Sequence, residues 1–193
     1  MEMRAGLPII GFEDIVAFGA WLAAEPRTSK GLWLKLAKKG AAATSLSKAE
    51  AIDAALCHGW IDGLRRGLDD IFFLQRFTPR KPRSLWSKIN VAKVERLIEA
   101  GRMLPAGLRE IETAKADGRW QAAYDGAARM QVPDDLASAL AGNRKAQAFF
   151  EALDRTNRYA FCFRVHTAVK PETRRARIEK FVGMLARGEK LHA

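Results

Sequence analysis

The side chains best suited to chemistry lie in a basic, proline-rich segment, "RFTPRKPRSLWSKIN", at residues 76–90. Pro79 and Pro82 fix two backbone φ angles, which holds the chain extended while the cations beside them project from it. A helix is predicted to begin just beyond, and the unpaired N–H groups and dipole of a helix start favour negative charge. The pattern therefore predicts a site for a phosphate-like anion.

Seven residues of this segment are candidates for contacting the anion. They are Arg80, Arg83, Ser84, Trp86, Ser87, Lys88 and Asn90. A second interpretation stays open, in which Ser87 and Asn90 only cap the helix, Trp86 only packs, and the cations are solvated.

Three further candidates for contacting the anion come from other parts of the chain: Trp60 and Asp62 in "GWIDG", and Arg174. A strand is predicted at "GWIDG", where Asp62 is unusual because aspartate is depleted in strands. It is expected to orient an arginine, to contact a ligand, or to act as a proton acceptor, which makes it a weak catalytic candidate. Arg174 falls on the same face of the last predicted helix as Ile178 and Phe181, so it is expected to point inward. An inward arginine needs an anionic partner, and Asp62 or the bound anion are the candidates.

The elements that must position these residues are mostly helices. Strands are predicted at 31–38, 60–66 and 71–78; the last two form a hairpin, whose first strand is expected to pair with 31–38. Helices are predicted at 12–25, 47–58, 91–100, 104–117, 134–141, 144–153, 155–168 and 171–187. Asn90 is the predicted cap of the helix at 91–100. We expect a mainly helical α+β protein with a small antiparallel sheet in the N-terminal part.

The net charge of +11 is concentrated in two segments. Residues 76–103 carry eight basic and two acidic side chains and residues 164–193 carry eight and three, while the rest of the chain is neutral. If the two segments meet in the fold, they form one positive surface that attracts anionic partners. If they lie apart, the charge only keeps the protein in solution, and this alternative stays open.

Several classes of protein are disfavoured by what the sequence lacks. No apolar run approaches the length of a membrane-spanning helix, and carboxylates stand where a secretory signal would be apolar, so a cytoplasmic location is expected. Cys57 and Cys162 are far apart and fit no metal-binding pattern, so we expect reduced thiols, no metal and no cofactor. No familiar catalytic motif is present, and whether the protein is an enzyme stays open.

An ordered series of motifs resembles the YdeI/OmpD-associated (OmdA-like) bacteriocin-protection family. The motifs are "ALCHGWIDG", "RFTPRKPRSLWSKIN", "GRMLPAGL", "DGRW", "VPDDLASALAGNRKAQAFFEAL" and "KPETRRARI", spread over roughly residues 12–190. The resemblance implies a bacterial stress-response protein for tolerance of bacteriocins or cationic antimicrobial peptides, with no established reaction. From the predicted elements, we expect an α+β domain at 1–128 and a helical OmdA-like domain at 129–193 packed against it. His58 departs from the family pattern, so no family-wide catalytic role is given to it.

Three functions follow from these observations. The favoured one is an accessory protein that binds an anionic small molecule or an acidic lipid headgroup. The second is a nucleic-acid-binding protein that uses residues 76–103 and 164–190, with Phe77 and Trp86 stacking on bases. The third is an enzyme acting on a phosphorylated small molecule, with Asp62 as base and Arg80, Arg83 or Arg174 stabilising charge. The sequence identifies no protein partner.

Overall fold

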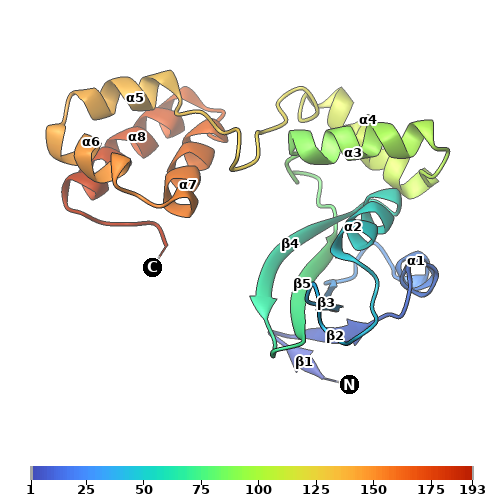
Figure 1. Ribbon diagram of the computed structural model, residues 1–193. Helices are drawn as coiled ribbons and strands as arrows, with labels where there is room; N and C mark the ends of the chain where they lie inside the picture. Colours follow the sequence, from blue (N-terminus) through green and yellow to red (C-terminus); the bar gives the residue numbers. More distant parts are fainter. Residues whose placement is uncertain (1, 193) are drawn as a thin grey trace. The chain divides into compact units, whose positions relative to one another are not determined.

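The computed structural model describes residues 2–192, which form two compact units, residues 2–86 with 90–122 and residues 87–89 with 123–192 (Figure 1). The strands are β1 (Met3–Arg4), β2 (Leu7–Gly11), β3 (Leu32–Ala37), β4 (Trp60–Gly67) and β5 (Phe72–Pro79). The helices are α1 (Ile15–Ala24), α2 (Lys48–Cys57), α3 (Lys88–Glu99), α4 (Pro105–Ala116), α5 (Asp134–Ala141), α6 (Arg144–Glu151), α7 (Arg155–His166) and α8 (Pro171–Ala186). The predicted α+β class, mainly helical, is confirmed.

The sheet of the first unit has the strand order β1-β2-β3-β5-β4. Its pairs are antiparallel except β2 with β3, which run parallel and are joined through α1. The sheet is therefore mixed, and β1 and β2 were not predicted. Pro8 lies inside the five-residue strand β2, and proline in a short run argues against a strand when only the sequence is read.

The predicted hairpin is present, but the predicted partner of residues 31–38 is wrong. β3 pairs with β5, the second strand of the hairpin, and β5 lies between β3 and β4. The burial of the two hairpin strands explains this order. Phe73, Leu74 and Phe77 of β5 are buried, whereas β4 is exposed from Gly63 to Gly67, so the more apolar strand takes the inner position.

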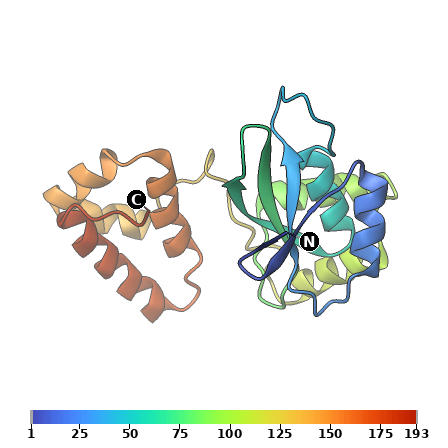
Figure 2. The ribbon, with the colours of Figure 1, turned by 90° about the horizontal axis from the view of Figure 1, so that it is seen from below.

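The core of the first unit lies between one face of the sheet and the helices α1 and α2 (Figure 2). Phe18 and Leu22 of α1 meet Leu34 and Phe77 there, and the four side chains are at most 2% exposed. The start of α2 has a capping box, in which Ser47 accepts a hydrogen bond from the Glu50 backbone N–H. These contacts fix β5, whose last residues carry the basic segment.

The second unit contains α5, α6, α7 and α8 around a separate core (Figure 1). Phe161 contacts Phe150 and Phe181 edge to face, with ring centroids 6.4 and 5.0 Å apart. Asn143 and Asp154 cap α6 and α7 by accepting hydrogen bonds from backbone N–H groups. α5 has the bounds that the sequence predicted, and the other three helices end within two residues of their predicted ends.

The predicted cap of α3 is wrong. The helix begins at Lys88, so Asn90 lies inside its first turn and is 9% exposed. The backbone N–H of Lys88 donates to the carbonyl oxygen of Tyr124 at 2.9 Å, which satisfies an amide at the helix start.

Candidate functional site

The end of β5 and the loop after it border a cavity of about 550 Å³ in the first unit, which we call the basic cavity. Side chains alternate along a strand, so Arg76 and Thr78 lie on the opposite face of β5 from the buried Phe77. Five cationic side chains line the basic cavity: Arg27, Lys30, Arg76, Arg80 and Lys81. None of the described residues that line it is an aspartate or glutamate, so all the charged side chains of its described lining are cationic.

The loop between α1 and β3 brings Arg27 and Lys30 to this cavity. Its last residue, Gly31, donates its backbone N–H to Ser29 Oγ at 3.2 Å. Gly31 has a φ of 95°, and a Cβ added there would lie closer than 3.0 Å to the carbonyl oxygen of Phe77. The absence of a side chain at Gly31 therefore lets the loop lie directly against β5.

Glu110 of α4 holds Arg27 in place. Nη2 of Arg27 lies 2.5 Å from Oε1 of Glu110. The Glu110 side chain is 8% exposed and that of Arg27 is 64% exposed. The ion pair therefore gives a buried carboxylate its charge partner, while most of the Arg27 side chain stays accessible.

Arg80 is held more rigidly, because its side chain is almost completely buried. Nη1 of Arg80 donates to the carbonyl oxygen of Leu85 at 3.2 Å, and the guanidinium lies 3.5 Å from the centre of the Trp86 ring. Trp86 in turn packs on Trp120, with ring centroids 5.0 Å apart. This cation–π contact keeps the charge of Arg80 at the cavity wall instead of in solvent.

Arg76 contributes a polar atom that the described part of the chain leaves unsatisfied. Its Nε is buried and finds no hydrogen-bond acceptor among residues 2–192. A buried donor without an acceptor costs about 1–3 kcal/mol, and the residue that carries this donor also lines the basic cavity.

The turn after Arg80 positions Lys81 through local hydrogen bonds. The backbone N–H of Lys81 donates to Ser84 Oγ at 2.9 Å, and the N–H of Ser84 donates to the Lys81 carbonyl oxygen at 2.8 Å. Arg119 Nη1 also donates to the Ser84 carbonyl oxygen, at 2.8 Å. Ser84 therefore shapes the turn, and Arg83 beside it is exposed and does not line the basic cavity.

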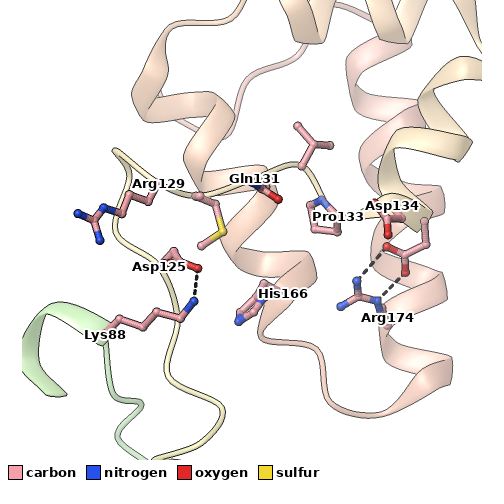
Figure 3. A pocket seen from close by; sticks show the side chains of 11 residues that line it. Lys88, Asp125, Arg129, Gln131, Pro133, Asp134, His166 and Arg174 are labelled. Carbon is pink, nitrogen blue, oxygen red and sulfur yellow. Dashed lines mark hydrogen bonds and ion pairs between the residues drawn. The ribbon is translucent and has the colours of Figure 1, made fainter. Parts of the chain in front are cut away.

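Two predicted site residues line a different cavity, of about 730 Å³, in the second unit (Figure 3). Lys88 lies there with its Nζ 2.7 Å from a carboxylate oxygen of Asp125. Arg174 binds Asp135 with two hydrogen bonds, of 2.5 and 2.9 Å, and donates to the Val165 carbonyl oxygen at 2.8 Å. The hydrogen bonds from Arg174 hold the pKa of Asp135 below its usual range. Carboxylates pair with two of the three lysine and arginine side chains of this larger cavity, against one of five in the basic cavity, so it is the weaker candidate for an anion site.

The remaining predicted residues are more dispersed. Asp62 is half-buried on β4. Burial raises the pKa of its carboxyl, although the positive charges of Lys48, Arg80 and Lys93 act to lower it. It does not line either of the two cavities described so far. Trp60, 3% exposed, lines a smaller cavity that also includes Arg80. The structure thus brings Trp60 and Arg80 together.

Buried residues at the start of α3 show a further difference between sequence and structure. Ser87 is 9% exposed and forms a bridge with Tyr124, so it belongs to the backbone pairing of the second unit.

Phe77 is fully buried and Trp86 is 2% exposed. The prediction that these two rings are available to stack on nucleic-acid bases is therefore wrong, because both rings are packed in the interior.

Sequence reasoning missed Arg27, Lys30 and Arg76 as members of the site. The stretch "PRTSKG" at residues 26–31 does carry a signal, since it places two cations and two hydroxyl groups between a proline and a glycine. Its proximity to β5 depends on the pairing of β3 with β5, in which Leu32 is opposite Phe77, and the sequence did not predict this pairing. Among residues 2–192, no group of three or more histidine, cysteine, aspartate or glutamate side chains is arranged to hold a metal ion.

Comparison with known families divides the chain in two. Residues 10–110, just over half of the chain, match a domain of unknown function (DUF8412), and residues 129–188 match the family described as Bacteriocin-protection, YdeI or OmpD-Associated. The chain belongs to the DUF8412 family and carries an OmdA domain. The predicted OmdA resemblance is thus confirmed, but for the C-terminal part alone.

The DUF8412 region contains all five cations of the basic cavity, whereas Arg174 lies in the OmdA region. Neither the curated proteins nor the solved structures that were compared give a match to the chain. Within residues 2–192, none of the helices combines the length and apolarity needed to cross a membrane.

Proposed function

We propose that this bacteriocin-protection-like protein binds a phosphate-like anion in the basic cavity of its DUF8412 region. The supporting observation is the convergence of five cationic side chains on one cavity with no carboxylate among its described lining residues. Like charges brought together repel each other, and an anion bound between them relieves the repulsion. Arginine side chains suit this role because their planar N–H groups match the oxygens of a phosphate.

The individual groups have different roles in this proposal. Arg76 offers a buried Nε that needs an acceptor, and Thr78 adds a hydroxyl on the same face of β5. Arg27 and Lys30 line the cavity from the loop before β3. Arg80, fixed over Trp86, contributes charge at a defined position. Several of these cations are positioned by other groups before binding, so little ordering is needed when an anion enters.

The test is calorimetric titration of the full chain with inorganic phosphate, for the wild type and for Arg76→Gln. Loss of one charge-assisted hydrogen bond is expected to weaken binding about tenfold. Arg83→Gln is the matched control, because it removes the same charge from the same segment at a residue that does not line the cavity. Its affinity should equal that of the wild type. Equal losses in both variants would mean that only net charge matters, and absence of phosphate binding would refute the proposal.

The source of the phosphate group is separated by two further titrations. Vesicles containing an acidic phospholipid test a headgroup, and a short oligonucleotide tests nucleic acid. Binding of the oligonucleotide alone, with affinity falling steeply as salt is added, would favour the nucleic-acid alternative over a small-anion site.

A further inference from the structure

A second, smaller cavity adjoins the basic cavity, and the two share Arg27, Pro79 and Arg80 as lining residues. Its volume is about 210 Å³. Trp60 and Leu22 supply apolar wall, and both belong to the core of the first unit. A ligand bound in the basic cavity therefore has a neighbouring space that its remaining atoms can enter.

The smaller cavity adds cationic and hydrogen-bonding groups of its own. Arg109 lines it from α4, and no carboxylate among residues 2–192 forms an ion pair with Arg109. His58 lies at the end of α2, half-buried, and burial lowers the pKa of its imidazole, which favours the neutral ring with one donor and one acceptor nitrogen. Glu25 is the one carboxylate in the lining, beside the three arginines at 27, 80 and 109.

We infer that the site is bipartite and takes a small organic molecule with two anionic groups, one in the basic cavity and the second beside Arg109 and His58. This inference rests on the proposed phosphate binding in the basic cavity. Cationic side chains line both cavities, since Arg27 and Arg80 are shared and Arg109 lines the smaller one. A single phosphate bound in the basic cavity would therefore leave Arg109 without an anionic partner. Trp60 and Leu22 then face the carbon skeleton that joins the two anionic groups, and a sugar bisphosphate has this composition.

The experiment compares inorganic phosphate, a hexose monophosphate and a hexose 1,6-bisphosphate by calorimetric titration of the full chain. The bisphosphate should bind about tenfold more tightly than the monophosphate, because it adds one charge-assisted contact. Arg109→Gln should remove this gain and leave the affinity for inorganic phosphate unchanged. Glu25→Gln should increase the gain, since it removes the negative charge next to the second anionic group.

The outcomes separate this inference from the proposal on which it depends. If inorganic phosphate binds and Arg76→Gln weakens it, but the bisphosphate binds no more tightly than the monophosphate, the bipartite site is refuted and phosphate binding stands. If Arg109→Gln weakens all three ligands equally, the second cavity is not a separate subsite, which also refutes the inference. If none of the three ligands binds, both ideas fail. Arg109 is exposed, so an unchanged urea midpoint is expected for its variant.

Discussion

Replacement of Gly31 by alanine tests whether close packing of the loop before β3 builds the basic cavity. The new Cβ would meet the carbonyl oxygen of Phe77 and the Cγ2 of Thr78, both closer than 3.0 Å. The carbonyl oxygen belongs to the backbone of β5, an inner strand of the sheet, and cannot rotate away as a flexible side chain can. The loop must therefore move away from β5, and it carries Arg27 and Lys30 with it.

The magnitude follows from two separate effects. At a φ of 95°, alanine is in a region that L-residues rarely adopt, and this strain costs about 1–2 kcal/mol. The steric overlap adds about 1–3 kcal/mol, the usual range for overpacking. Gly40 supplies the control, because it has a φ of 82° and nothing within 4 Å of an added Cβ. Both variants also lose the flexibility of glycine in the unfolded chain, so this contribution cancels when they are compared.

Urea unfolding followed by tryptophan fluorescence measures the effect in the first unit alone, because all five tryptophans lie in residues 2–86 and 90–122. Gly31→Ala is expected to lower the free energy of unfolding by about 1–3 kcal/mol more than Gly40→Ala. It should also weaken phosphate binding, which Gly40→Ala should not change. Equal losses of stability in the two variants, or unchanged phosphate binding in Gly31→Ala, would refute the reasoning.

Three further predictions concern single titratable groups. Burial raises the folded-state pKa of Asp62, so the free energy of unfolding should fall as pH rises from the unfolded-state pKa to the folded-state pKa. Asp62→Asn should remove that pH dependence, as measured by urea titrations at several pH values. A variant with the same pH profile as the wild type would contradict this prediction. The ion pair with Arg174 lowers the pKa of Asp135. The contribution of this pair to the stability of the fold is therefore present above the unfolded-state pKa and is lost as pH falls through the folded-state pKa. An NMR titration of the Asp135 carboxyl should show a higher pKa in Arg174→Met, and an unchanged pKa would count against the pairing. Burial raises the pKa of the thiols of Cys57 and Cys162, so a thiol reagent should modify both slowly in the native protein and quickly in urea. Rapid modification of the native protein would argue against the burial of these thiols.

Local signals in the sequence were sufficient to predict most elements of this fold. The capping box at Ser47, the proline that opens α8 and the alternation of Leu32, Leu34 and Leu36 in β3 are read from neighbouring residues, and each marks an element that the structure contains. The order of the strands was not predictable in this way. The order depends on which strand is buried on both faces, and this strand is β5. Phe77 is buried on one face, and Leu74 is buried on the opposite face because residues of β2 and Trp33 pack against it.

The site shows the same division between local and long-range information. Arg80 could be singled out because two prolines flank it, which is a local pattern. The carboxylate that binds Arg174 could not be identified from the sequence. Asp135 lies 39 residues away from it, and several other carboxylates could have been its partner. Arg174 was expected to point inward and to pair with Asp62 or a bound anion. It is half-buried, but its carboxylate partner is Asp135, so the prediction of Asp62 as the partner is wrong. That the basic segments at 76–103 and 164–193 form one surface stays a prediction.

The placement of charge favours an indirect route to peptide tolerance over direct capture. Two carboxylates of the first unit have cationic partners: Glu110 pairs with Arg27 and Asp53 with Lys93, at 2.5 and 2.6 Å. Arg27 is one of the five cations of the basic cavity, and the other four have no carboxylate among the described lining residues, so a cationic peptide would be repelled there. An anionic metabolite or headgroup would be attracted to the same cavity. On the proposed function, protection against a cationic peptide would therefore depend on what the protein does with that anion, and Arg76→Gln should weaken phosphate binding and reduce that protection together.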